Sequence, residues 1–389
     1  MARVTRKIHL IATEESGDRL GAPLMRELKE RFGDDVVFTG IGGSSMAGEG
    51  LQSLFPIEQL SIIGFTAVLK RLPSLLRLIA QATAQVLQVK PDLLVIIDSP
   101  DFTHRVARRV RRRDASIPIV NYVSPTVWAW RPGRAKAMRG YVDHVLALLP
   151  FEPDVHRKLG GPPCTYVGHP LIEQIAALRP NDSEQQRRDT QPPVLLVLPG
   201  SRRSEIRHHM ATFGAAFDLL AQRGVAFELI LPTVPHLVDG VTEAVKAWRQ
   251  QPRIVVGETE KRGAFRIAHA ALAKSGTVTL ELALAGVPMV TAYKGGQIEA
   301  RIARRLVTSS SVILANLVIG ENVIPEFLQD DCTPEKLAAA LHDVLAATPM
   351  RQRQVTAMAR LDDIMGIGRT SPSCAAADLV AGYAGGADH

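Results

Sequence analysis

Cysteine is scarce in this sequence, and long apolar runs are missing. The three cysteines, Cys164, Cys332 and Cys374, are odd in number and lack the spacing of a metal site. This pattern argues against disulfide-rich secreted domains and zinc modules. No run approaches the roughly 18 apolar residues of a membrane-spanning helix, and the first run stops at Glu14, too early for a signal peptide. We predict a cytoplasmic protein without a metal.

Two common nucleotide-binding motifs are also absent. GxGxxG does not follow the first predicted strand and GxxxxGK[ST] does not occur, which disfavours dinucleotide and P-loop enzymes. Positive charge, by contrast, is plentiful, because 46 Lys and Arg face 39 Asp and Glu, a net charge of +7. Such an excess favours anionic partners. We predict no nucleic acid among them, because no helix or strand carries clustered base-reading side chains.

Apolar strands alternate with helices along a chain of 389 residues, long enough for two domains. The predicted strands are 7–13, 36–41, 93–97, 118–123, 145–149, 165–167, 194–198, 227–231, 254–256, 271–273 and 289–293. This alternation predicts an α/β protein with doubly wound parallel sheets. The polar, proline-containing residues 176–193 are predicted to link domains 1–175 and 190–367. A last helix within 368–389 is expected to pack back on the first domain.

Residues 271–290 contain a strand, a turn of small residues, a helix and a second strand. Ser275, Gly276 and Thr277 form the turn, where free backbone N–H groups and hydroxyls could bind an anion. Glu281 follows one turn later and leans back toward a ribose beside that anion. Gly200, Ser201 and Arg202 form a second loop of this kind after strand 194–198. Together the loops predict a nucleotide diphosphate site. The alternative is two ordinary capped helices.

Several polar residues follow strands of the first half, where ligands gather in parallel sheets. Asp98 ends strand 93–97 and is predicted to be a general base, with a loop-bracing carboxylate as the alternative. Asp101 is the predicted N-cap of the next helix. Glu14, Ser16 and Asp18 are predicted to recognise sugar hydroxyls, and the alternative is that Ser16 or Asp18 caps a helix from Arg19. Trp128 and Trp130 either stack on a sugar or acyl chain or pack internally.

Residues 60–80 are apolar with interleaved Lys70, Arg71 and Arg77. They form either a pair of core helices broken at Pro73 or a basic amphipathic surface that enters a membrane interface or holds acyl chains. In the second case the protein is peripherally associated with the inner membrane.

Nine segments resemble, in order, those of the lipid-A-disaccharide synthase family. They are ESGD at 15–18, GIGG at 40–43, DSPDF at 98–102, YVSPTVWAWRPGR at 122–134, LLPFE at 148–152, VGHP at 167–170, LPGSR at 198–202, SGTVTLE at 275–281 and ANLVIGE at 315–321. The tryptophan-containing segment is the most specific. The chain departs from the family pattern at Thr13, Glu15 and Ala67.

The resemblance implies a GT-B glycosyltransferase, with two Rossmann-like domains facing a cleft and no cofactor. Its reaction joins UDP-2,3-diacylglucosamine to 2,3-diacylglucosamine 1-phosphate with inversion, releasing UDP and a β-1,6-linked disaccharide 1-phosphate. The alternative is a UDP-sugar enzyme without transfer, such as a 2-epimerase of the same fold. The family also suggests a homodimer. With the residues above, the expected site comprises Asp98 as base, substrate-binding Glu14, Ser16, Gly17, Asp18, Asn121, Ser124 and Trp128, and nucleotide-binding Gly200, Ser201, Arg202, Ser275, Gly276, Thr277, Glu281 and Asn316.

Overall fold

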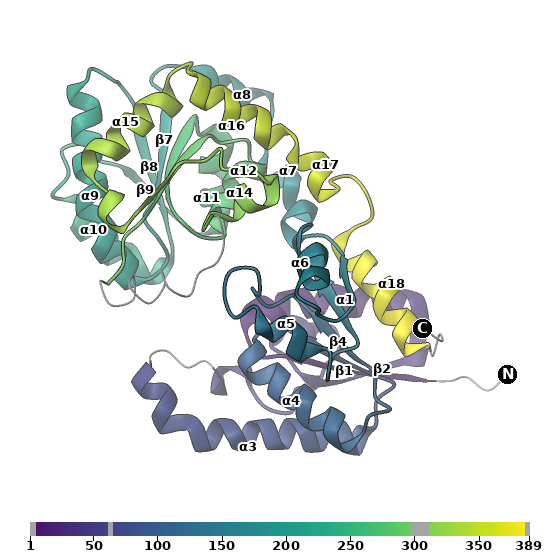
Figure 1. Ribbon diagram of the computed structural model, residues 1–389. Coiled ribbons are helices and arrows are strands. Elements are labelled where there is room, and N and C mark those ends of the chain that lie inside the picture. Colours follow the sequence, from purple (N-terminus) through teal and green to yellow (C-terminus); the bar gives the residue numbers. More distant parts are fainter. Residues whose placement is uncertain (1–4, 61–64, 297–310, 386–389) are drawn as a thin grey trace. The chain divides into compact units, whose positions relative to one another are not determined.

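The computed structural model describes residues 5–60, 65–296 and 311–385, with the backbone alone over 65–72. Contacts divide the chain into two units. Unit 1 comprises residues 1–172 and 368–389, and unit 2 comprises residues 173–367. Each unit contains a six-stranded sheet in which every neighbouring pair is parallel. The predicted α/β fold with two doubly wound parallel sheets is thereby confirmed (Figure 1).

Unit 1 has the strand order β2-β1-β3-β4-β5-β6. Its strands are β1 (Arg6–Ala12), β2 (Val36–Ile41), β3 (Leu93–Ile97), β4 (Ile119–Tyr122), β5 (His144–Ala147) and β6 (Cys164–Tyr166). Its helices are α1 (Glu15–Phe32), α2 (Ser44–Gly48), α3 (Phe65–Val89), α4 (Pro100–Arg113), α5 (Gly133–Met138), α6 (Glu152–Lys158) and α18 (Pro372–Ala384).

Side-chain alternation along the strands of unit 1 builds a core on each face of the sheet. Ile8 and Leu10 of β1 point into one core, with apolar residues of α1 and α18. Ile11 points into the other, with apolar residues of α3 and α4. Helices cover both faces of the sheet (Figure 1), so its strands are almost continuously apolar. The loops at the carboxyl ends of the strands are left for polar residues.

Unit 2 has the strand order β12-β11-β10-β7-β8-β9. Its strands are β7 (Val194–Leu198), β8 (Glu228–Thr233), β9 (Arg253–Val256), β10 (Ala270–Lys274), β11 (Met289–Tyr293) and β12 (Glu326–Leu328). Its helices are α7 (Ile175–Leu178), α8 (Asp182–Asp189), α9 (Arg203–Gln222), α10 (Val238–Val245), α11 (Glu258–Ile267), α12 (Val278–Leu284), α14 (Leu314–Ile319), α15 (Pro334–Leu345), α16 (Pro349–Ala359) and α17 (Leu361–Met365). Helices α9, α10 and α15 pack on one face of this sheet around the buried Phe213 and Phe217.

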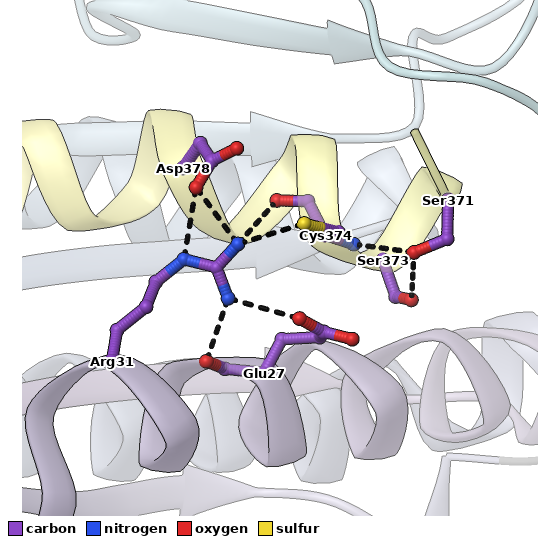
Figure 2. A network of polar contacts seen from close by, with 6 residues as sticks. All are labelled: Glu27, Arg31, Ser371, Ser373, Cys374 and Asp378. Atoms are coloured by element: carbon purple, nitrogen blue, oxygen red, sulfur yellow. Dashed lines mark hydrogen bonds and ion pairs between the residues drawn. The ribbon is translucent and has the colours of Figure 1, made fainter. Parts of the chain in front are cut away.

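Helix α18 packs on α1 in unit 1, far from it in sequence. Figure 2 shows the Arg31 guanidinium of α1 between Glu27 of its own helix and Asp378 of α18. Arg31 also donates to the Cys374 carbonyl oxygen at 3.0 Å. Burial lowers the pKa of Arg31, but these hydrogen bonds have the larger effect and raise it further above its ordinary value. Arg31 is therefore always positively charged, and it holds α18 against α1.

Three local predictions need correction, and one strand was missed. Residues 176–193 contain helices α7 and α8 rather than an unstructured linker, and Asn181 caps α8 through a reciprocal hydrogen-bond pair with Glu184. Helix α3 continues through Pro73 instead of breaking there. The N-cap of α4 is Ser99, and Asp101 lies in its first turn. Strand β12 was not predicted, because three half-buried residues are too few to show a period.

Candidate active site

A cavity of about 570 Å³ opens at the carboxyl ends of the unit 2 strands. Strands β7 and β10 are parallel neighbours there, so the loops that follow them lie side by side. Six of the eight predicted nucleotide-binding residues line the cavity, namely Gly200, Ser201, Arg202, Gly276, Thr277 and Glu281. The two loops that sequence reasoning paired over some 75 residues are thus brought together around one space.

Two backbone N–H groups of the first loop already have an acceptor within the protein. The Glu205 carboxylate accepts hydrogen bonds from the Ser201 N–H at 2.9 Å and the Arg202 N–H at 3.2 Å. Gly200 has φ +126, and an added Cβ would lie 2.3 Å from Glu205 Oε2. Glycine is therefore required by the packing of Glu205. These two N–H groups, predicted to bind a phosphate, are bonded to Glu205 in this structure.

Two lysines and two further carboxylates, all missed by sequence reasoning, complete the cavity wall. Lys274 Nζ lies 3.0 Å from Glu205 Oε1. Burial raises the pKa of Glu205, but the hydrogen bond and charge of Lys274 outweigh it, so the net pKa is lowered. Lys261 lies between Glu281 at 2.8 Å and Glu258 at 3.0 Å. Among the cations of this wall, Arg202 alone forms no ion pair within the residues that the structure describes, although its charge helps to lower the pKa of Glu205.

The remaining two predicted nucleotide-binding residues do not line the cavity. Ser275 is 7% exposed, and its hydroxyl has no partner among the described residues. Asn316 is 1% exposed, donates to the Ile324 carbonyl oxygen at 2.9 Å and accepts from the Ile324 N–H at 3.0 Å. Its amide thus braces the backbone after α14 in the manner of a strand partner.

Asp98 lies at the carboxyl end of β3 in unit 1. Its φ is +52 and that of Ser99 is +45, a left-handed conformation uncommon outside glycine. The Asp98 carboxylate accepts from the Ser99 N–H at 2.7 Å and, at 3.4 Å, from the Ser16 hydroxyl. Ser99 in turn donates from its hydroxyl to Glu14 Oε1 at 2.8 Å. The structure therefore joins Glu14, Ser16 and Asp98 in one polar cluster at the ends of the adjacent strands β1 and β3.

Gly17 and Asp18 both have structural roles at the start of α1. An added Cβ on Gly17 would lie 3.3 Å from the Ala12 Cβ, so glycine lets α1 approach the sheet closely. Asp18 is 1% exposed, and its carboxylate accepts from the N–H groups of Gly43, Ser45 and Met46 at the start of α2. Asp18 is therefore no cap of its own helix, which begins at Glu15. It stabilises the N-terminus of α2, as a carboxylate does there.

Trp128 and Ser124 belong to a buried network that sequence reasoning did not find. The Trp128 indole N–H donates to Glu152 Oε1 at 3.3 Å, and the Leu149 N–H donates to Oε2 at 3.0 Å. Burial raises the pKa of Glu152 to about 7, although these hydrogen bonds favour the carboxylate. The Ser124 hydroxyl lies 2.9 Å from Nε2 of the fully buried His156. Trp128 also meets the Phe151 ring edge-on.

Asn121 is buried at the second-last position of β4, just before the loop that carries Ser124 and Trp128. Its amide donates to the Val123 carbonyl oxygen at 2.9 Å and its Oδ1 lies 3.2 Å from His104 Nε2. Val123 has φ +79, an unusual conformation for a β-branched side chain. Asn121 and the Val123 N–H bond to the Leu146 carbonyl oxygen hold this turn. Asn121 thus supports the loop that carries Ser124 and Trp128.

The predicted amphipathic surface, residues 60–80, lies partly outside the described residues, because 61–64 are not described and no side chain of 65–72 is. In the described parts of the chain no helix is long and apolar enough to cross a membrane. The same parts hold no group of three or more His, Cys, Asp or Glu side chains arranged for a metal ion.

Solved structures with the same fold have low sequence identity to this chain. A UDP-GlcNAc 2-epimerase from Neisseria meningitidis bound to UDP-GlcNAc has a TM-score of 0.60 at 11% identity, with 97% of this chain and 98% of that chain covered. CalG4, the calicheamicin glycosyltransferase, has a TM-score of 0.61 at 17% identity, with 98% of each chain covered. They confirm the GT-B type of fold, and at such identity they do not favour the 2-epimerase alternative.

Sequence relatives are much closer. The family model described as Lipid-A-disaccharide synthetase matches residues 8–378. A lipid-A-disaccharide synthase of Rhodopseudomonas palustris (strain BisB18) is 72% identical over 377 residues, which are 97% of this chain and 95% of that protein. One of Bradyrhizobium diazoefficiens (strain USDA 110) is 68% identical over 375 residues, 96% of each. The chain therefore belongs to the lipid-A-disaccharide synthase family of glycosyltransferases.

Proposed function

We propose that the unit 2 cavity binds the UDP part of a UDP-2,3-diacylglucosamine donor, whose sugar the protein transfers to 2,3-diacylglucosamine 1-phosphate. The gathering of six predicted nucleotide-binding residues around one cavity is the observation that supports this site. Arg202, which forms no ion pair among the described residues, is suited to a phosphate, since a guanidinium can contact two of its oxygens. Glu281, 15% exposed and turned to Lys261, is suited to a ribose hydroxyl.

Asp98 is the proposed general base of the transfer. Its carboxylate takes the proton from the acceptor 6-hydroxyl while that oxygen attacks the anomeric carbon and UDP leaves. The Ser99 N–H and Ser16 hydroxyl orient the carboxylate, and Glu14 holds the Ser99 hydroxyl. General-base catalysis typically contributes about 10²–10⁴-fold to the rate. Arg202 stabilises the negative charge that develops on the departing diphosphate.

An Asp98→Asn variant tests the base. The amide keeps the size of the side chain but cannot take a proton, so turnover should fall about 10²–10⁴-fold while UDP affinity stays. Asp101→Asn is the matched control, because Asp101 lies three residues later in the first turn of α4, is largely exposed and pairs with Arg134. Disaccharide and UDP formed from the two purified lipid substrates are measured. Near-normal turnover of Asp98→Asn would remove it from the chemistry.

Peripheral attachment to an anionic membrane is proposed for the same protein, because both substrates carry acyl chains and the chain has an excess of positive charge. The interleaved Lys70, Arg71 and Arg77 are the proposed contacts. Replacing all three by Gln should release the protein from vesicles containing anionic lipid, as measured by co-sedimentation. Undiminished sedimentation would place the contact elsewhere.

A homodimer is the proposed oligomer, and a monomer mass in light scattering would refute it.

A further inference from the structure

The proposed nucleotide cavity contains a lysine, Lys274, that lies outside the predicted nucleotide-binding residues. It is the last residue of β10, and its side chain is 20% exposed. An added Cβ on Gly276 would lie 3.5 Å from Lys274 Nζ. The ammonium group is therefore at the turn before α12. It also lies 5.5 Å from the centre of the Tyr293 ring.

The formal charges around this cavity cancel. Its lining side chains include three cations and three carboxylates, namely Arg202, Lys261, Lys274, Glu205, Glu258 and Glu281. The sum is 3 − 3 = 0. A nucleoside diphosphate carries several negative charges. Its phosphates therefore need N–H donors that are not already bonded to these carboxylates. Arg202 supplies some of them, and a second source has to be found among the remaining groups.

Counting donors narrows the choice. The N–H groups of Ser201 and Arg202 are both directed at the Glu205 carboxylate. Lys261 has Glu281 and Glu258 within 3.0 Å and is thereby held between two acids. An ammonium group has three N–H donors, and Lys274 has a single carboxylate partner among the described residues, Glu205 at 3.0 Å. Lys274 can therefore bind a phosphate oxygen without giving up its ion pair.

The position of Lys274 suits this role. Through Glu205 it is connected to the loop after β7, and through its own backbone to the turn after β10, two strands that are adjacent and parallel. We propose that Lys274 is a phosphate-binding residue of the donor site, whose ammonium contacts the diphosphate while Glu205 holds it in place. This inference rests on the proposed function, because it requires a nucleotide diphosphate in this cavity.

Binding of UDP and of uridine to the full-length protein, measured by calorimetry, tests the proposal. Lys274→Met removes the charge and should weaken UDP binding about ten- to a hundredfold, as expected for a hydrogen bond between charged groups. Uridine, which has no phosphate, should bind as before. Lys246→Met is the matched control, because Lys246 is an exposed lysine that also pairs with one glutamate, Glu243. If Lys274→Met does not fold, Lys274→Gln keeps a donor for Glu205 and carries the same expectation.

Glu205→Gln distinguishes direct binding of the phosphate by Lys274 from an indirect role of Lys274 in positioning Glu205. It removes the negative charge of the ion pair but leaves an oxygen for the Ser201 N–H and keeps the Lys274 ammonium, so UDP affinity should fall much less than in Lys274→Met. Equal losses in Glu205→Gln and Lys274→Met would overturn the proposal, because Lys274 would then act only through Glu205. Unchanged UDP affinity in Lys274→Met would overturn it as well. If the wild-type protein binds no UDP, the proposed function fails and this inference fails with it.

Discussion

Glu152 should make the stability of unit 1 depend on pH, over a pH range that is set by the effect of burial on its pKa. It is 3% exposed, and its pKa is raised from 4.5 to about 7. Between these two values the folded protein keeps a proton that the unfolded chain has lost. The stabilisation is complete below pH 4.5 and is lost as pH rises through 7. Since a pKa change of one corresponds to about 1.4 kcal/mol, the loss is about 3 kcal/mol.

Glu152→Gln removes this titration and keeps an acceptor for the Trp128 indole N–H. The difference in free energy of unfolding between variant and wild type should therefore move by about 3 kcal/mol in favour of the variant from pH 4.5 to 7.5. The difference is needed because buried histidines act in the opposite sense. Burial lowers the pKa of His104 and of His156 from 6.5 to about 4, so each destabilises the fold as pH falls from 6.5 toward 4.

Hydrogen exchange in urea, followed in peptides from β4 to β6 at several pH values, gives the free energy for unit 1 alone. Glu30→Gln is the control, because Glu30 lies on an exposed position of α1 in the same unit. A pH-independent difference between Glu152→Gln and wild type would refute the reasoning. It would mean that the donors around Glu152 hold it as a carboxylate throughout.

Two further changes test the loop in unit 2 and the C-terminal helix. Gly200→Ala places a Cβ 2.3 Å from Glu205 Oε2 at φ +126, so the melting temperature and the UDP affinity should both fall. The control Gly224→Ala, at φ +81 with nothing within 4 Å, should cost only the backbone strain of about 1 kcal/mol. Equal effects of the two changes would contradict the role of Glu205. Arg31→Met should cost about 1–2 kcal/mol of α18 attachment, since Asp378 is largely exposed; faster proteolysis before α18 checks this, and unchanged cleavage would contradict it.

The strands and their loops could be predicted from the sequence because their signals are local. A buried parallel strand is a short apolar run, and its polar carboxyl-end loop follows directly in the chain. All eleven predicted strands therefore reappear within one or two residues of the observed bounds. Short β12 was missed, and the polar segment 176–193 was mistaken for a linker because helix α8 is amphipathic only weakly.

Partners of individual side chains were less predictable. Asp18 lies in a motif that suggests ligand binding, yet its carboxylate meets the N-terminus of α2, some 25 residues away. Asn316 braces Ile324 instead of lining the cavity. Glu205 follows Arg202 by three residues, a spacing that suggests a capping side chain, and this signal could have been used. Glu152 showed no such signal, because its partner Trp128 comes from another loop.

The sequence by itself determined the alternation of strands and helices, the residues at each strand end and, through its motifs, the family. The tertiary structure alone decided which donors remain free for a ligand. Strand order places β10 beside β7, and this pairing brings Lys274 to Glu205. Such contacts depend on the register of distant segments, whereas sequence patterns report only on residues a few positions apart.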